Sequence, residues 1–169
     1  MPRTQVLVAG GGLTGLSAAV FLAWHGVQSV VVERHADLPR RPASRAVNPR
    51  TMEVLRQVGL EHAVMRHGDA RTKNPMSPCT AVSIAQDRFE GILRDRAEAL
   101  GAMVCFGTEL RSFDASADSV TATVVDDDGE YTVEADGSDD LGFPVLLGRR
   151  GRPRWQCRAA ARPAPRTAR

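Results

Sequence analysis

Three glycines near the N-terminus have the spacing of a turn that binds a dinucleotide. Gly10, Gly12 and Gly15 form a G-x-G-x-x-G pattern. In such a turn the first glycine permits a tight bend, the second lets a pyrophosphate approach the backbone, and the third lets the next helix pack closely. Glu33 stands roughly 20 positions further on, where a carboxylate accepts hydrogen bonds from a ribose. The pattern predicts a dinucleotide site, with a turn that serves only packing as the alternative.

The segments around the glycines have the character that such a site needs. Residues 5–9 are a short, β-branched apolar run, and residues 13–25 carry apolar side chains at helical spacing. Residues 29–32 form a second buried strand that ends at Glu33. Strand, turn, helix and strand make a βαβ unit, which places a bound anion at the N-terminus of the helix.

Two polar stretches after this unit are predicted to be loops. Residues 35–47 are rich in Pro and Arg, and residues 68–78 show no periodicity. Between them, Asn48 is a candidate N-cap with Pro49 at the first helical position, so a helix is expected over residues 50–58.

The second half of the chain predicts one long helix and a set of strands. Residues 60–66 favour a short helix, and residues 86–100 are clearly amphipathic. Residues 103–106 read as a strand. Three further strands are predicted at 109–113, 119–125 and 130–134, and a DDDG turn at 126–129 joins the last two. The order indicates an α/β nucleotide-binding fold with a parallel sheet and a small antiparallel β-meander.

The charged residues divide the chain into two parts. The composition, 43% apolar and 25% charged, is that of a globular protein. All acidic residues precede Gly148, whereas the segment that follows holds eight arginines and no acid. We therefore expect a folded domain over 1–147 and an irregular basic tail over 148–169, which resembles the product of a shifted reading frame. Binding of nucleic acid by the tail is less favoured, because no recognition motif accompanies the arginines.

The cysteines, histidines and apolar residues argue against a metal site and a membrane span. The cysteines are odd in number and lack a C-x-x-C pair, and the histidines lack ligand spacing, so no metal site is expected. The same cysteine usage favours the cytoplasm. No apolar run approaches the length of a membrane span, so no membrane partner is expected. Nothing in the sequence indicates the oligomeric state.

Five longer segments of the sequence indicate which dinucleotide the site would bind. They are VLVAGGGLTGLSAAVFLAWHGV, VVVERH, SRAVNPRTMEVLRQVGLEHAV, QDRFEGILRDRAEALGA and FGTEL. Together they cover most of residues 5–125, and they resemble the FAD-dependent aromatic hydroxylases of the p-hydroxybenzoate hydroxylase type, in particular the actinomycete hydroxylases of aromatic polyketides. This resemblance favours FAD over the NAD of an ordinary dehydrogenase. It implies a Rossmann-like FAD-binding domain in an enzyme that uses NADPH or NADH to insert oxygen into an aromatic ring.

The resemblance also implies roles for individual residues. The pyrophosphate would lie against Gly10, Gly12, Leu13, Thr14 and Gly15. The adenosine would contact Glu33 through its ribose, with Arg34 and the backbone of Leu110 near the adenine. Arg45 would reach the phosphate or ribityl chain, and Gln86 would bind the chain that links the two halves of FAD. No residue is assigned a catalytic role.

Simpler interpretations stand beside these roles. Arg45 could be one solvated charge among several arginines, and Gln86 could cap its helix. Arg34 and His35 could be surface residues that follow a strand.

The chain also departs from the family pattern. The interval over residues 65–85, where members carry strands of the substrate domain, looks short. The later segments that face the flavin ring and the substrate have no counterpart, so the fold is expected to be incomplete and the substrate stays unidentified. The alternative function is a non-catalytic FAD-binding remnant or frameshifted fragment.

Overall fold

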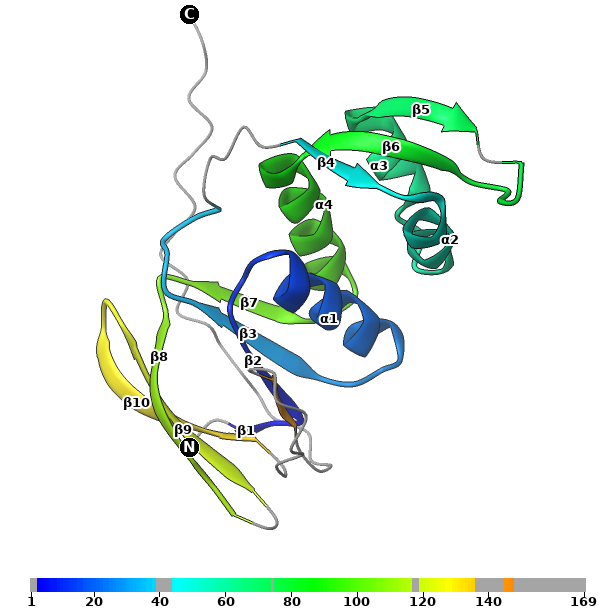
Figure 1. Ribbon diagram of the computed structural model, residues 1–169. Helices are drawn as coiled ribbons and strands as arrows, with labels where there is room; N and C mark the ends of the chain where they lie inside the picture. Colours follow the sequence, from blue (N-terminus) through cyan, green and yellow to red (C-terminus); the bar gives the residue numbers. More distant parts are fainter. Residues whose placement is uncertain (1–2, 39–43, 74, 117–118, 136–144, 148–169) are drawn as a thin grey trace, which may run out of the picture.

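The chain folds around a central sheet of mostly parallel strands (Figure 1). The computed structural model describes residues 3–38, 44–73, 75–116, 119–135 and 145–147. The sheet has the order β11-β2-β3-β7. Its parallel strands are β2 (Val6–Ala9), β3 (Ser29–Glu33) and β7 (Met103–Phe106), and β11 (Val145–Leu147) pairs antiparallel with β2 at the edge.

Helices cover one face of this sheet and a β-meander covers the other. The helices α1 (Leu13–Trp24) and α4 (Gln86–Ala99) pack against each other. Side chains on a strand point alternately to its two faces, so Val6 and Val8 join the core under the helices. Leu7 and its neighbours on β3 instead join the core against the meander. The predicted α/β fold with a parallel sheet is confirmed.

The meander is a second sheet, in the order β1-β10-β9-β8. The antiparallel strands are β8 (Glu109–Ala115), β9 (Val120–Asp126) and β10 (Gly129–Ala135). The acidic turn joins β9 to β10 as predicted, and Gly129 there has a φ of 123°. The strand β1 (Arg3–Thr4), which the sequence did not indicate, pairs in parallel with β10.

A third sheet lies beyond the helices and corrects both predicted loops. Its strands β4 (Ser44–Val47), β6 (Thr80–Ala85) and β5 (Asp69–Lys73) pair antiparallel in that order. The prediction of loops over 35–47 and 68–78 is therefore wrong at β4 and β5. Both are short strands that owe their conformation to pairing with β6 rather than to their own residues. The strands β5 and β6 also lie within residues 65–85, the interval that looked short for strands of the substrate domain.

Two short helices, α2 (Pro49–Gln57) and α3 (Glu61–His67), pack against β6. The predicted cap of α2 is confirmed, because Asn48 Oδ1 accepts a hydrogen bond from Thr51 N–H at 2.8 Å. Within the described ranges, no helix combines the length and the apolar composition that crossing a bilayer requires. The predicted tail over 148–169 lies outside the described residues.

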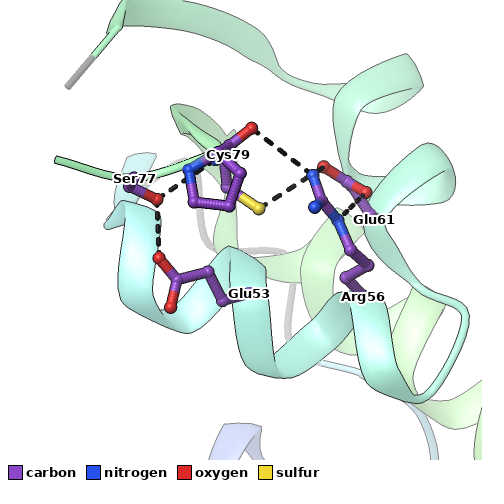
Figure 2. Close-up of polar contacts among 6 residues, drawn as sticks. Glu53, Arg56, Glu61, Ser77 and Cys79 are labelled. Atoms are coloured by element: carbon purple, nitrogen blue, oxygen red, sulfur yellow. Dashed lines mark hydrogen bonds and ion pairs between the residues drawn. The ribbon is translucent and has the colours of Figure 1, made fainter. Parts of the chain in front are cut away.

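A polar network fixes the segment before β6 against α2 and α3 (Figure 2). Arg56 donates from Nε and Nη2 to the two carboxylate oxygens of Glu61, at 2.6 and 2.7 Å. Ser77 Oγ donates to Glu53 at 2.7 Å and accepts from the Cys79 N–H at 3.1 Å. The thiol of Cys79 lies 3.6 Å from Glu61 Oε1, and burial raises the pKa of this thiol. The neutral thiol can therefore donate to the carboxylate.

The network makes stability depend on pH in the acid range. The hydrogen bond from Arg56 lowers the pKa of Glu61 below its usual 4.5. A lowered carboxyl pKa stabilises the fold above the unfolded value, and this contribution disappears as the pH falls through the folded value. We expect Glu61→Gln to lower the free energy of unfolding at pH 7, measured by urea unfolding. The free energy of unfolding should also fall less between pH 7 and pH 3.5 in the variant than in the wild type. Glu130→Gln, which changes an exposed side chain of β10, should leave the pH dependence of stability unchanged. If the two variants changed it equally, the contact between Arg56 and Glu61 would not be its cause.

Candidate functional site

The glycine turn lies between β2 and α1, where its backbone is held close to two strands. Gly10 has a φ of 106°, a conformation that side chains disfavour, and its N–H donates to Val32 O of β3 at 2.8 Å. A Cβ added to Gly15 would lie 1.9 Å from the carbonyl oxygen of Gly10. The first and third glycines of the motif are therefore required by the turn itself.

The position between the first two motif glycines is also restricted, which the motif did not indicate. Gly11 N–H donates to Glu33 Oε2 at 2.7 Å. A Cβ on Gly11 would approach the Cβ of Glu33 to 2.8 Å and the ring of Phe106 to 3.4 Å. The run of three consecutive glycines was the available signal. This contact joins the turn to the acid at the end of β3, so the two predicted parts of the site form one unit.

Glu33 is held in its ionised form by several donors. Burial alone would raise the pKa of its carboxyl, but the N–H groups of His35 and Gly11 and the His35 ring together lower it. The His35 N–H donates to Glu33 Oε1 at 3.0 Å, and the ring Nδ1 contacts the same oxygen. His35 is therefore more than the surface residue of the simpler interpretation, although its side chain is exposed. A carboxylate has about four acceptor positions, so Glu33 can still accept from a ligand.

The N-terminus of α1 is open to an anion. Its N-cap is Gly12, which supplies no side-chain hydrogen bond, and the first turn contains no acidic residue. The first amides of a helix lack intrahelical partners and carry partial positive charge. A Cβ on Gly12 would meet nothing closer than Glu90 Oε1, at 3.8 Å. The backbone from Gly12 through Leu13 and Thr14 can therefore approach a phosphate group closely.

The other predicted residues lie on separate elements of the fold. Arg34 follows β3 and is exposed. Arg45 was expected in a loop but lies in β4, opposite Ile84 of β6. Leu110 lies on β8, near Thr108, whose N–H donates to the backbone oxygen of Glu33 at 2.9 Å. The end of β3 and the start of β8 are thus adjacent, which brings Leu110 to the Glu33 end of the site.

Gln86 opens α4 and contacts a buried acid that sequence reasoning missed. Its Nε2 donates to Glu90 Oε1 at 2.9 Å, and Glu90 is only 2% exposed. The available signal was an acid beside Phe89 on the apolar face of an otherwise regular amphipathic helix. Glu90 borders the glycine turn, because its Oε1 would lie 3.8 Å from a Cβ on Gly12, and Gln86 is joined to the turn through Glu90.

No metal site accompanies this arrangement in the described part of the chain. There, no group of three or more His, Cys, Asp or Glu side chains lies together. The chemistry that the site supports is the binding of a phosphate-containing nucleotide.

Sequence comparison identifies relatives of the chain. A family described as FAD binding domain matches residues 3–137. The tetracenomycin A2 monooxygenase-dioxygenase of Streptomyces glaucescens is 34% identical, over 80% of this chain and 33% of that protein. The aklavinone 12-hydroxylase of Streptomyces purpurascens is 35% identical, over 79% of this chain and 31% of that protein. The chain thus spans about a third of the length of these relatives.

Solved structures show the same fold. Aklavinone-11 hydroxylase in complex with FAD and aklavinone has a TM-score of 0.71 at 34% identity, covering 76% of this chain and 31% of that one. The anhydrotetracycline hydroxylase of Streptomyces rimosus has a TM-score of 0.72 at 30% identity, covering 83% and 32%. The resemblance to flavoprotein hydroxylases of polyketides is confirmed.

Proposed function

The chain belongs to the FAD binding domain family, and on this premise we propose that it is the cofactor-binding N-terminal part of a flavin-dependent monooxygenase. The enzyme would hydroxylate an aromatic, polyketide-like substrate with NAD(P)H as the reductant. The observation that carries the proposal is the bond from Gly11 N–H to Glu33, because it joins a phosphate-binding turn to a ribose-binding acid.

The geometry of the turn fits the ADP half of FAD. The pyrophosphate would lie at the backbone of Gly12, Leu13 and Thr14, on the free amides of α1. Glu33 would accept from the ribose hydroxyls, which its ionised state favours. Once bound, FAD supplies the electron transfer and oxygen insertion, while the protein binds, orients and excludes water.

The other predicted residues complete the proposed site. Arg34 and the backbone of Leu110 would meet the adenosine at the end of β3. Arg45 would bring a permanent positive charge to the phosphates or the ribityl chain, and Gln86 would bind the linking chain. None of these side chains is proposed to react with the substrate.

The substrate class rests on the relatives. Their names cite tetracenomycin A2, aklavinone and anhydrotetracycline, and a further relative is named as a putative polyketide hydroxylase. We place the activity in the cytoplasm, where NAD(P)H is supplied.

Titration of the purified full chain with FAD tests the proposal. Saturable quenching of flavin fluorescence, with a shifted absorption band, is expected. NADPH oxidation measured on the same sample separates a catalytic chain from the alternative of an FAD-binding remnant, which would bind FAD without oxidising NADPH. A chain that folds but binds neither FAD nor ADP would refute the proposed function.

Gly12→Ala should separate FAD binding from stability. Gly12 has a φ of −84°, which alanine adopts freely, and its added Cβ meets no atom closer than 3.8 Å. The methyl group would instead occupy the space that the pyrophosphate needs. We expect FAD affinity to fall roughly tenfold or more and the thermal unfolding midpoint of the ligand-free chain to stay nearly unchanged. Unchanged FAD affinity would show that the pyrophosphate does not lie at Gly12.

A further inference from the structure

A buried carboxylate lies where a phosphate-binding site would be expected to avoid one. Glu90 on α4 is 2% exposed, and it is the one acidic side chain buried to this degree among the described residues. Its Oε1 accepts from Gln86 Nε2 at 2.9 Å. Its Oε2 is also buried and has no hydrogen-bond partner among the described residues.

The position of Glu90 relates this unsatisfied oxygen to the nucleotide site. A Cβ on Gly12 would lie 3.8 Å from Glu90 Oε1, so the carboxyl borders the second glycine of the turn. The packing of α1 against α4 sets this distance. The carboxyl therefore lies beside the proposed path of the cofactor, immediately next to the pyrophosphate position.

The chemistry of a carboxylate limits what it can face there. An ionised carboxylate only accepts hydrogen bonds, and a like charge repels it at short distance. A phosphate oxygen is therefore a poor partner, whereas a hydroxyl group is a good one. The hydroxyl-bearing part of FAD that adjoins the pyrophosphate, on the side away from the adenosine, is its ribityl chain.

We propose that Glu90 binds the ribityl chain of FAD, with Oε2 accepting a hydrogen bond from a ribityl hydroxyl while Oε1 holds the Gln86 amide beside it. This inference rests on the proposed FAD binding. Glu90 would then favour FAD over a nucleotide, such as ADP, that has no ribityl chain.

A purely structural role for Glu90 predicts the opposite effect on stability. A buried acceptor without a partner costs free energy, so Glu90 destabilises the ligand-free chain. Glutamine has the same shape, lacks the charge and can still pair with Gln86. Glu90→Gln should therefore stabilise the ligand-free chain, whereas it would destabilise the chain if the charged acceptor for Gln86 held α4 in place.

The test compares two ligands on the full chain and on its Glu90→Gln variant. FAD binding is followed by flavin fluorescence and ADP binding by calorimetry, because ADP has no ribityl chain. Asp95→Asn on the same helix, with a side chain that is 70% exposed, is the matched control. Thermal unfolding of each ligand-free chain is measured in parallel.

We expect Glu90→Gln to weaken FAD binding roughly tenfold, to leave ADP binding unchanged, and to raise the unfolding midpoint by a few degrees. The control should change none of the three. Unchanged FAD affinity, an equal loss for ADP, or a variant that is less stable or does not fold would overturn the role of Glu90. A wild-type chain that binds neither ligand would instead refute the proposed function, so the two failures can be told apart.

Discussion

Gly15→Ala is expected to destabilise the nucleotide-binding turn and abolish detectable FAD binding. The added Cβ would lie 1.9 Å from Gly10 O and 3.2 Å from a methyl group of Val8. The first of these is a backbone atom in a turn already held by a hydrogen bond to β3, so it cannot move aside as a side chain could. The start of α1 must shift away from β2, which opens the core beneath it. We expect a loss of about 3 kcal/mol in the free energy of unfolding and at least a hundredfold weaker FAD binding.

Gly91→Ala is the matched control for this prediction. Gly91 lies within α4, and its added Cβ would meet only Leu38 Cδ1, at 3.9 Å. Alanine is the better helix former by about 1 kcal/mol, so this variant should be slightly more stable than the wild type and should bind FAD normally. The measurements are thermal unfolding and flavin fluorescence. A Gly15→Ala chain with normal stability would mean that α1 does not approach the turn as closely as described.

Regular apolar spacing in the βαβ unit and in α4 explains which parts of the fold could be predicted. The βαβ unit and α4 combine a period with a turn or a glycine stop, so their residues alone determine their type. The strand β5 consists of polar residues (DARTK) and β4 of a short mixed run (SRAV). Their conformation depends on β6, a partner that no local pattern indicates. Tertiary pairing overrides local preference in such strands.

The site was predictable where the motif specifies a residue type. The motif assigns Gly10, Gly15 and Glu33, and the structure places these beside one another. Gly11 was missed because the motif leaves its position open, although a Cβ there would approach the Cβ of Glu33 to 2.8 Å. Glu90 was missed because only the packing of α4 against α1 brings it to the turn.

Glu33→Gln is expected to weaken the binding of ADP and of FAD equally. The carboxylate accepts from Gly11 N–H and from His35 N–H, at 2.7 and 3.0 Å, and it is the proposed acceptor for the ribose hydroxyls. Glutamine can accept through only one of its terminal atoms, and without charge assistance. Since a hydrogen bond to a charged group contributes about 1.5–3 kcal/mol, we expect both affinities to fall roughly tenfold to a hundredfold. The equal effect on ADP distinguishes Glu33 from Glu90.

The same variant should alter how stability depends on pH, in a direction that the pKa of Glu33 determines. Burial raises the pKa of this carboxyl, but the backbone hydrogen bonds from His35 and Gly11, with the His35 ring, bring it below its usual 4.5. A lowered pKa means that Glu33 stabilises the fold above about pH 4.5, and that this contribution disappears as the pH falls through the lowered value. Urea unfolding at pH 7 should therefore find Glu33→Gln less stable than the wild type, and the difference should shrink below pH 4. Glu130→Gln provides the control at an exposed position. If the variant were less stable than the wild type by the same amount at pH 7 and at pH 3, the ionised carboxylate would not hold the turn. The hydrogen bond from Gly11 to Glu33 would then contribute no stability that depends on the charge.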